Sequence, residues 1–224
     1  MLRPVCYILS LLVLFMVGCT TDPHVAEQIS RAESIYLDMP DSAQKILSTI
    51  SNREISSKSL RARHALLLTY CNDKCYIDTT SDSLIRVAVD FYESRHDRRH
   101  LMVAQYLLGR VYFEGQRYSE ALVAFLRAEE MALKERDNLY LGLSYRAMAD
   151  IFTRSYNGAV ALEYGKLAYK HFALHGNNIY TDWALADLGR LYHNAKDYTQ
   201  AISTLSDVMA MSKKSGNTAL YAEA

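Results

Sequence analysis

Apolar and polar positions recur with a period of 40 residues between residues 102 and 215. Within each copy the apolar positions are spaced as on one face of an α-helix, and glycine, asparagine or aspartate separates successive runs. The recurring positions are Gly109, Ala149 and Gly189; Tyr112, Phe152 and Tyr192; Ala121, Ala161 and Ala201; and Ala128, Ala168 and Val208. The pattern predicts an all-α array of antiparallel helix pairs.

The small residues of this pattern predict close helix packing. Glycine inside a helix costs roughly 1 kcal/mol relative to alanine, so Gly109 requires a compensating contact. Ala121, Phe125 and Ala128 form one stripe on the next predicted helix, and we expect that helix to approach Gly109 closely. Gly115 is expected to end the first helix of its pair. Asp or Asn side chains should cap the helices that begin the copies, at Asp97, Asp137, Asn177 and Asn217.

The N-terminal half carries the same pattern in weaker form. We expect one helix pair over residues 24–50, with a proline-led second helix at Pro40, and another pair over 57–72 and 81–94. Residues 24–98 are therefore interpreted as degenerate repeats, and 99–224 as the regular array. Because Asn217 begins another copy that only a few residues follow, we expect the array to continue beyond residue 224.

The regular copies resemble the tetratricopeptide repeat (TPR), whose helix pair is marked by Leu-Gly, Tyr, Ala, Phe and Ala. The matching positions are Leu108, Gly109, Tyr112, Ala121, Phe125 and Ala128, then Tyr145, Ala149, Phe152, Ala161 and Ala168, then Leu188, Gly189, Tyr192 and Ala201. The 40-residue period is similar to a longer-helix variant of bacterial regulatory proteins, and Gly165 replaces a large residue, which predicts looser packing. The resemblance implies a right-handed α-solenoid, a TPR-like superhelix.

The first 18 residues have the pattern of a secretory signal, with Arg3 followed by an apolar run from Val5 to Val17. That run is shorter than the roughly 20 residues a bilayer-spanning helix needs. The sequence Met16-Val17-Gly18-Cys19 resembles the lipobox of bacterial lipoproteins. The resemblance implies a lipid on Cys19, a tether over 19–23, and a place on the periplasmic face of the inner or outer membrane in a Gram-negative-type cell envelope. The alternative is an ordinary signal peptide with an incidental cysteine.

Composition and motifs give no support for catalysis. Lysine and arginine total 25, equal to aspartate and glutamate, so charge does not favour nucleic acid. Cys71 and Cys75 are four residues apart and allow either a local disulfide or free thiols. His171 and His175 have the spacing of a helical metal pair, but no further ligand accompanies them, so we expect no metal site. We also find no phosphate loop or nucleophile turn, and expect neither enzyme activity nor a cofactor.

The TPR resemblance implies that first helices of the pairs line a concave groove. The groove positions in this chain are Tyr106, Arg110, Phe113, Arg146, Asp150, Arg154, Trp183, Arg190 and His193. Arginines with interleaved aromatic rings favour a protein or peptide partner, with an acidic or C-terminal segment as the preferred ligand. In the alternative interpretation, Arg110 pairs with Asp150, Trp183 packs between helices, and the surface is only solvated.

Together these features predict a lipid-anchored cell-envelope scaffold that binds a protein or peptide partner in its groove and has a sensory or regulatory role. Two other functions stay open at this point. Small TPR lipoproteins also take part in outer-membrane protein assembly, and others bind glycans during nutrient uptake with the help of a large extra domain.

Overall fold

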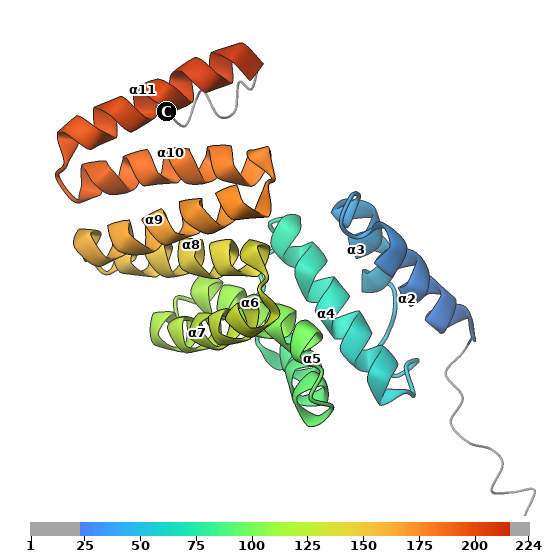
Figure 1. The fold of residues 1–224 in the computed structure, drawn as a ribbon. Coiled ribbons are helices and arrows are strands. Elements are labelled where there is room, and N and C mark those ends of the chain that lie inside the picture. Colours follow the sequence, from blue (N-terminus) through green and yellow to red (C-terminus); the bar gives the residue numbers. More distant parts are fainter. Residues whose placement is uncertain (1–22, 216–224) are drawn as a thin grey trace, which may run out of the picture. The chain divides into compact units, whose positions relative to one another are not determined.

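The computed structural model describes residues 23–215, which form ten helices and no strand within that range (Figure 1). The helices are α2 (Pro23–Ile35), α3 (Pro40–Ser48), α4 (Lys58–Lys74), α5 (Ser83–Ser94), α6 (Arg98–Glu114), α7 (Tyr118–Glu135), α8 (Asn138–Arg154), α9 (Gly158–His175), α10 (Asn178–Asn194) and α11 (Tyr198–Ser215). Within the described range they belong to two compact units, one comprising residues 23–78 and 83–91 and the other 79–82 and 92–215. The expected all-α solenoid of antiparallel helix pairs is confirmed.

The first unit has its own core, in which α2, α3 and α4 pack together. Ile29, Leu47 and Cys71, one from each helix, are fully buried there. Pro40 begins α3 as expected, with Asp41 in its first turn. The imidazole Nε2 of His64 lies 2.9 Å from the carbonyl oxygen of Leu47, and burial lowers the pKa of this histidine. This contact ties α4 to the C-terminal end of α3.

Cys71 and Cys75 are free thiols in this structure. Helix α4 continues through residues 72 and 73 to Lys74, so no helix end separates the two cysteines. Burial raises the pKa of the Cys71 thiol to about 12. It also raises the pKa of Cys75 to about 11, with a further contribution from a hydrogen bond to Asp41. Both thiols are therefore protonated and poorly nucleophilic near neutral pH.

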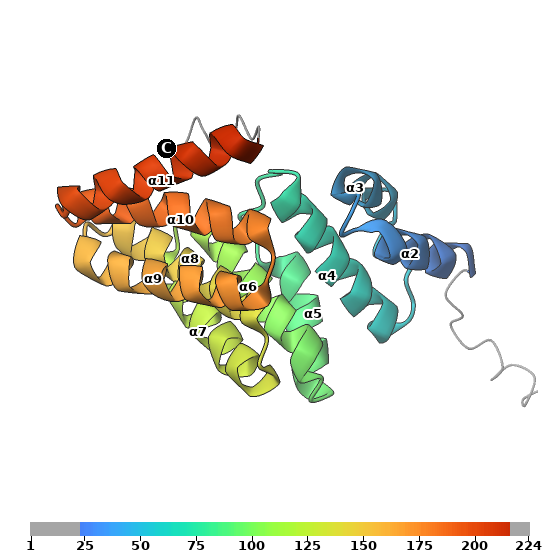
Figure 2. The same ribbon diagram turned by 45° about the horizontal axis from the view of Figure 1, so that its top comes forward.

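The second unit contains three antiparallel pairs, α6 with α7, α8 with α9, and α10 with α11. The first helices begin at residues 98, 138 and 178, and the second helices at 118, 158 and 198. Helix α8 contacts both α6 and α10, whereas α7, α9 and α11 do not contact one another in the described chain. The first helices therefore lie closer together than the second helices, and Figures 1 and 2 show how the successive pairs stack.

In the second unit, each turn between helices from α6 to α11 contains one residue in the left-handed backbone region. Gln116, Tyr156 and Lys196 occupy it within the pairs, with φ of 57°, 57° and 64°, and Arg136 and Gly176 between the pairs, with φ of 55° and 81°. Gly115 ends α6 as expected, because it is the C-cap residue, with φ of −75°. The left-handed residue of this turn is the next one, Gln116.

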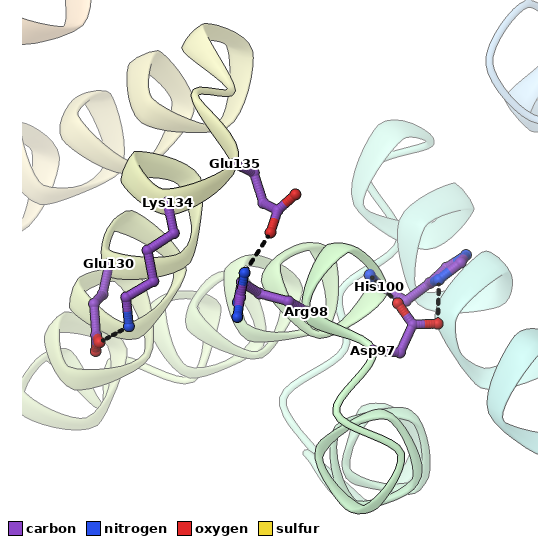
Figure 3. Close-up of polar contacts among 6 residues, drawn as sticks. All are labelled: Asp97, Arg98, His100, Glu130, Lys134 and Glu135. Carbon is purple, nitrogen blue, oxygen red and sulfur yellow. Dashed lines mark hydrogen bonds and ion pairs between the residues drawn. The ribbon is translucent and has the colours of Figure 1, made fainter.

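The predicted N-caps are confirmed within the described range. The carboxylate of Asp97 accepts a hydrogen bond from the backbone N–H of His100, and Asp137 and Asn177 accept from Tyr140 and Ile179. Figure 3 shows that the Asp97 carboxylate also contacts the His100 ring, at 2.8 Å. Nearby, Arg98 at the start of α6 donates to Glu135 at the end of α7 over 3.0 Å, and Lys134 pairs with Glu130 (Figure 3). These exposed ion pairs stabilise the helix pair of α6 and α7 only slightly.

The glycine positions confirm the predicted close packing. A Cβ atom at Gly109 would overlap the ring of Phe125, and one at Gly142 the ring of Phe172. Phe125 is fully buried. A Cβ atom at Gly189 would overlap the side chain of Leu205 in the same way. The absence of a side chain therefore lets a large side chain of the partner helix pack against the backbone.

Several expectations fall outside the described range. The signal segment, the lipidation site at Cys19 and the cap at Asn217 all belong to residues 1–22 or 216–224, and they stay predictions. Within residues 23–215, none of the helices combines the length and apolar character needed to cross a bilayer.

Candidate functional site

Helices α6, α8 and α10 present a row of charged residues, which we call the charged face: Arg110, Glu114, Arg146, Asp150, Arg154, Asp187 and Arg190. Arg110, Asp150 and Arg190 occupy the same position in successive repeats. Arg110 donates to Glu114 over 3.1 Å, and Arg190 donates to Asp187. Asp150 lies near both arginines but, among the described residues, makes no hydrogen bond or ion pair. The alternative interpretation, in which Arg110 pairs with Asp150, is wrong in its partner, because Arg110 pairs with Glu114.

Asp187 is the residue of this face that the sequence analysis did not single out. Its Oδ2 accepts a hydrogen bond from Arg146 Nε at 2.6 Å, and its Oδ1 accepts from Arg190. The carboxylate thus joins α8 to α10 and pairs with two of the four arginines. A signal was present, because an acid three residues before Arg190 is an ordinary helical ion pair. With Asp187 included, four arginines face three acids, and the excess positive charge is one.

The electrostatics of this face follow from partial burial. The Asp150 carboxyl is open to solvent on one side, but the surrounding helices remove part of its hydration, and this desolvation raises its pKa against the opposing effect of Arg146. For Arg146, desolvation lowers the pKa, but the neighbouring Asp187 carboxylate outweighs it and the pKa is raised. Arg146 therefore stays charged, and the oxygens of Asp150 accept no hydrogen bond from the described residues.

The aromatic residues predicted for the groove pack inside the array. Tyr106 is 8% exposed, and its ring lies 5.8 Å from that of Phe125 and 5.7 Å from that of Tyr140. Phe113 is also 8% exposed, with the Arg154 guanidinium 4.9 Å above its ring. The expectation that these two rings are exposed is wrong, because the next helix pair covers the edge of α6.

The remaining predicted residues lie on α10. Trp183 is half-buried and packs against the cluster of Ala186 and Val208, as the packing alternative predicted. His193 is exposed, and its ring lies edge-on to that of Tyr198 at 5.7 Å. The structure therefore brings Arg110, Arg146, Asp150, Arg154 and Arg190 together, and assigns Tyr106, Phe113 and Trp183 to packing.

A pocket opens beside the charged face, between α8, α9 and α10. Its volume is about 50 Å³. The floor is apolar and the rim polar. The floor consists of Ala149, Gly165, Ala168, Ala184 and Leu191, and the rim of Arg146, Asp150, Thr153, Asp187, Arg190 and Asn194. The looser second repeat predicted from Gly165 thus coincides with an open space.

The histidine pair on α9 serves packing in this structure. His171 Nδ1 lies 2.9 Å from the amide oxygen of Asn138, and the ring of His175 lies edge-on to Tyr180. In the described part of the chain, no three His, Cys, Asp or Glu side chains come together as metal ligands would.

Comparison with known proteins gives a fold likeness alone. No family model matches the chain, and no curated protein matches it in sequence. Among solved structures it resembles the apo form of RapI, with a TM-score of 0.71 and 14% identity over 87% of this chain and 72% of RapI. It also resembles a Rap protein complexed with Competence and Sporulation Factor, with a TM-score of 0.73 and 14% identity over 98% of this chain and 62% of that one.

A third similar structure contains kinesin light chain TPR-like repeats from Podosopora anserina. The TM-score is 0.63, with 15% identity over 87% of this chain and 97% of that one. The chain has a TPR-like fold. Because the identities are below 25%, the likeness to these TPR-like proteins extends to the helical-repeat architecture and carries no function by itself. The chain also spans less than two thirds of the length of the Rap protein in the complex.

Proposed function

We propose that this chain is a binding scaffold that holds a segment of a protein or peptide on the charged face of α6, α8 and α10. The observation that carries the proposal is the pocket with an apolar floor and charged rim, which opens beside this face. Such a combination provides apolar area for affinity and polar groups for orientation. The Rap structure in complex with Competence and Sporulation Factor offers an analogy for binding by a TPR-like fold.

The proposed ligand carries an acidic side chain or a C-terminal carboxylate at one end of this face. Arg154 stacks over Phe113 and makes no ion pair within the described residues. Its guanidinium therefore keeps its donors for a carboxylate, which arginine binds well because two N–H groups can point at two oxygens. Arg146 and Arg190 are less available, since both pair with Asp187.

The proposal includes the cellular setting that the N-terminal sequence predicts. Acyl chains on Cys19 would hold the scaffold on the periplasmic face of an envelope membrane, where it would act in sensing or regulation by binding and not by catalysis. Outer-membrane protein assembly is the alternative within the same class of function. Glycan binding is a further alternative.

Site-specific photo-crosslinking in cells tests the binding face. A crosslinker at Asn194, an exposed residue on the pocket rim, should capture a defined partner, whereas one at Lys170, which is exposed on α9, should not. Arg154→Ala should reduce capture from Asn194 at least about tenfold, equivalent to 1.4 kcal/mol, because the carboxylate of the ligand loses its donor.

Equal capture from Asn194 and Lys170 would contradict a binding face on the first helices. Capture of a β-barrel assembly protein would instead support the assembly alternative. Recovery of bound sugar without a protein would support the glycan alternative.

Replacement of Cys19 tests the anchor. Cys19→Ala should move the protein from the membrane fraction to the soluble fraction and abolish incorporation of labelled palmitate, because the acylated thiol is lost. Cys71→Ala removes a thiol from the same chain and should leave fractionation unchanged. A Cys19→Ala protein that still sediments fully with membranes would rule out the lipid anchor.

A further inference from the structure

The pocket lies at a position of the 40-residue repeat where the second copy differs from the other two. Phe125, Gly165 and Leu205 occupy the same position in three successive copies. The Phe125 ring packs over Gly109, and Leu205 packs over Gly189. In the second copy the corresponding positions hold Ala149 and Gly165, so two small residues replace the glycine and the large side chain of the other copies. Both line the pocket.

Neighbouring side chains fill only part of the space that this substitution leaves. Leu191 of α10 reaches toward Gly165, so that a Cβ atom there would overlap its Cδ1. An opening of about 50 Å³ remains. By this measure it has room for about three to five water molecules or one small aliphatic group. An aromatic side chain would not fit without movement of the walls.

The rim of the pocket is electrically balanced but has one unused acceptor. Arg146 and Arg190 carry two positive charges, and Asp150 and Asp187 carry two negative charges. Asp187 accepts hydrogen bonds from both arginines. Asp150 accepts none from the described residues, and the nearby arginines at positions 110, 146 and 190 oppose the approach of a cation. A neutral N–H donor is therefore the group that suits Asp150 best.

We propose that the pocket is a specificity site for one small aliphatic side chain, alanine or valine, of a bound extended peptide, with a neighbouring backbone N–H of that peptide donating to Asp150. The inference rests on the proposed function and adds the residue that the scaffold selects. Apolar burial on the floor favours the aliphatic group, and the limited volume rejects larger ones. A hydrogen bond to a charged acceptor fixes the peptide backbone beside it.

Binding of a positional-scanning library of hexapeptides, acetylated at the N-terminus and with a free C-terminal carboxylate, tests this inference on the purified mature protein. At one position we expect alanine or valine to be selected over phenylalanine, lysine and glutamate. The selected peptide should bind at least about tenfold more weakly to Gly165→Leu, because the new side chain and the Leu191 methyl group that it displaces take up the space of the pocket. Methylation of the backbone nitrogen beside the selected residue should weaken binding to a similar extent.

Asp150→Ala supplies a second variant, because its exposed side chain can be removed without disturbing the fold. It should weaken binding of the selected peptide about tenfold and make that binding insensitive to N-methylation. Asp207→Asn, an exposed change on α11, is the matched control and should bind as the unchanged protein does.

The outcomes separate this inference from the proposed function. One outcome would overturn the pocket and leave the binding face intact. In that outcome peptides bind without preferring a small residue, Arg154→Ala weakens their binding, and neither Gly165→Leu nor Asp150→Ala changes it. If no peptide in the library binds the unchanged protein, both proposals fail.

Discussion

Gly109→Ala is expected to lower the free energy of unfolding by about 1–3 kcal/mol, although alanine is the better helix former by roughly 1 kcal/mol. The added methyl group would overlap the Phe125 ring, which is fully buried and cannot rotate into solvent. Either the ring leaves its preferred rotamer or α6 and α7 move apart. Urea unfolding followed by circular dichroism measures the change.

The matched control is Gly115→Ala at the end of the same helix. Its φ of −75° suits alanine, and the nearest atom to a new Cβ, the Val111 carbonyl oxygen, lies 3.4 Å away. We expect its unfolding free energy to stay within about 0.5 kcal/mol of the unchanged protein, as for most substitutions without a packing conflict.

A double-mutant cycle then assigns the Gly109→Ala loss to the ring. Phe125→Ala alone should cost about 3–5 kcal/mol, because it empties a core position. In that background Gly109→Ala should be neutral or slightly stabilising, since the clash is gone and the helix propensity remains. If Gly109→Ala were equally destabilising with and without Phe125, close packing against this ring would not be the reason for glycine at position 109.

Local signals account for the parts of the fold that the sequence predicted. The N-caps at Asp97, Asp137 and Asn177 depend on a side chain and a backbone N–H two or three residues away, so the sequence contains the whole interaction. The Gly109 contact was also predictable, because a repeat displays glycine and its partner stripe at fixed spacing. The helix end at Gly115 was predictable from glycine, whereas the left-handed residue after it, Gln116, carries no such signal, since glutamine rarely adopts that conformation.

The candidate site was harder to predict because it depends on contacts between repeats. Tyr106 was expected on the surface, but its ring meets Phe125 of α7 and Tyr140 of α8. The period indicates which face of α6 a residue occupies, but not how far the next pair covers that face. Asp187 was missed for a similar reason: its contact with Arg146 joins residues 41 positions apart, on α8 and α10.

Asp187→Asn should change the ligand preference of the charged face. The carboxylate now pairs with Arg146 and Arg190, and only 15% of its side chain is exposed. The asparagine side chain is nearly the same size but neutral, so both arginines lose their ionic partner and can pair with a ligand. The positive excess on the face rises from one to two.

The measured effect should be a gain for acidic peptides. For an acetylated and amidated hexapeptide with four glutamates, we expect about tenfold tighter binding at low salt, equivalent to 1.4 kcal/mol, and a weaker gain at 0.5 M salt, where the charges are screened. The matching lysine peptide should bind more weakly than to the unchanged protein. The gain for the acidic peptide and the loss for the lysine peptide have the same cause, because Arg146 and Arg190 no longer pair with a carboxylate at position 187.

Asp207→Asn on α11 separates the local effect from net charge, because it removes one negative charge at an exposed position outside the charged face. It should leave both affinities unchanged within about twofold, since Asp207 pairs with neither Arg146 nor Arg190 and its exposed charge is screened by solvent and salt. If both variants raised the affinity for the acidic peptide equally, net charge and not the release of Arg146 and Arg190 would set the preference. If neither did, Arg146 and Arg190 would not contact the ligand, because their release from Asp187 would have left its affinity unchanged.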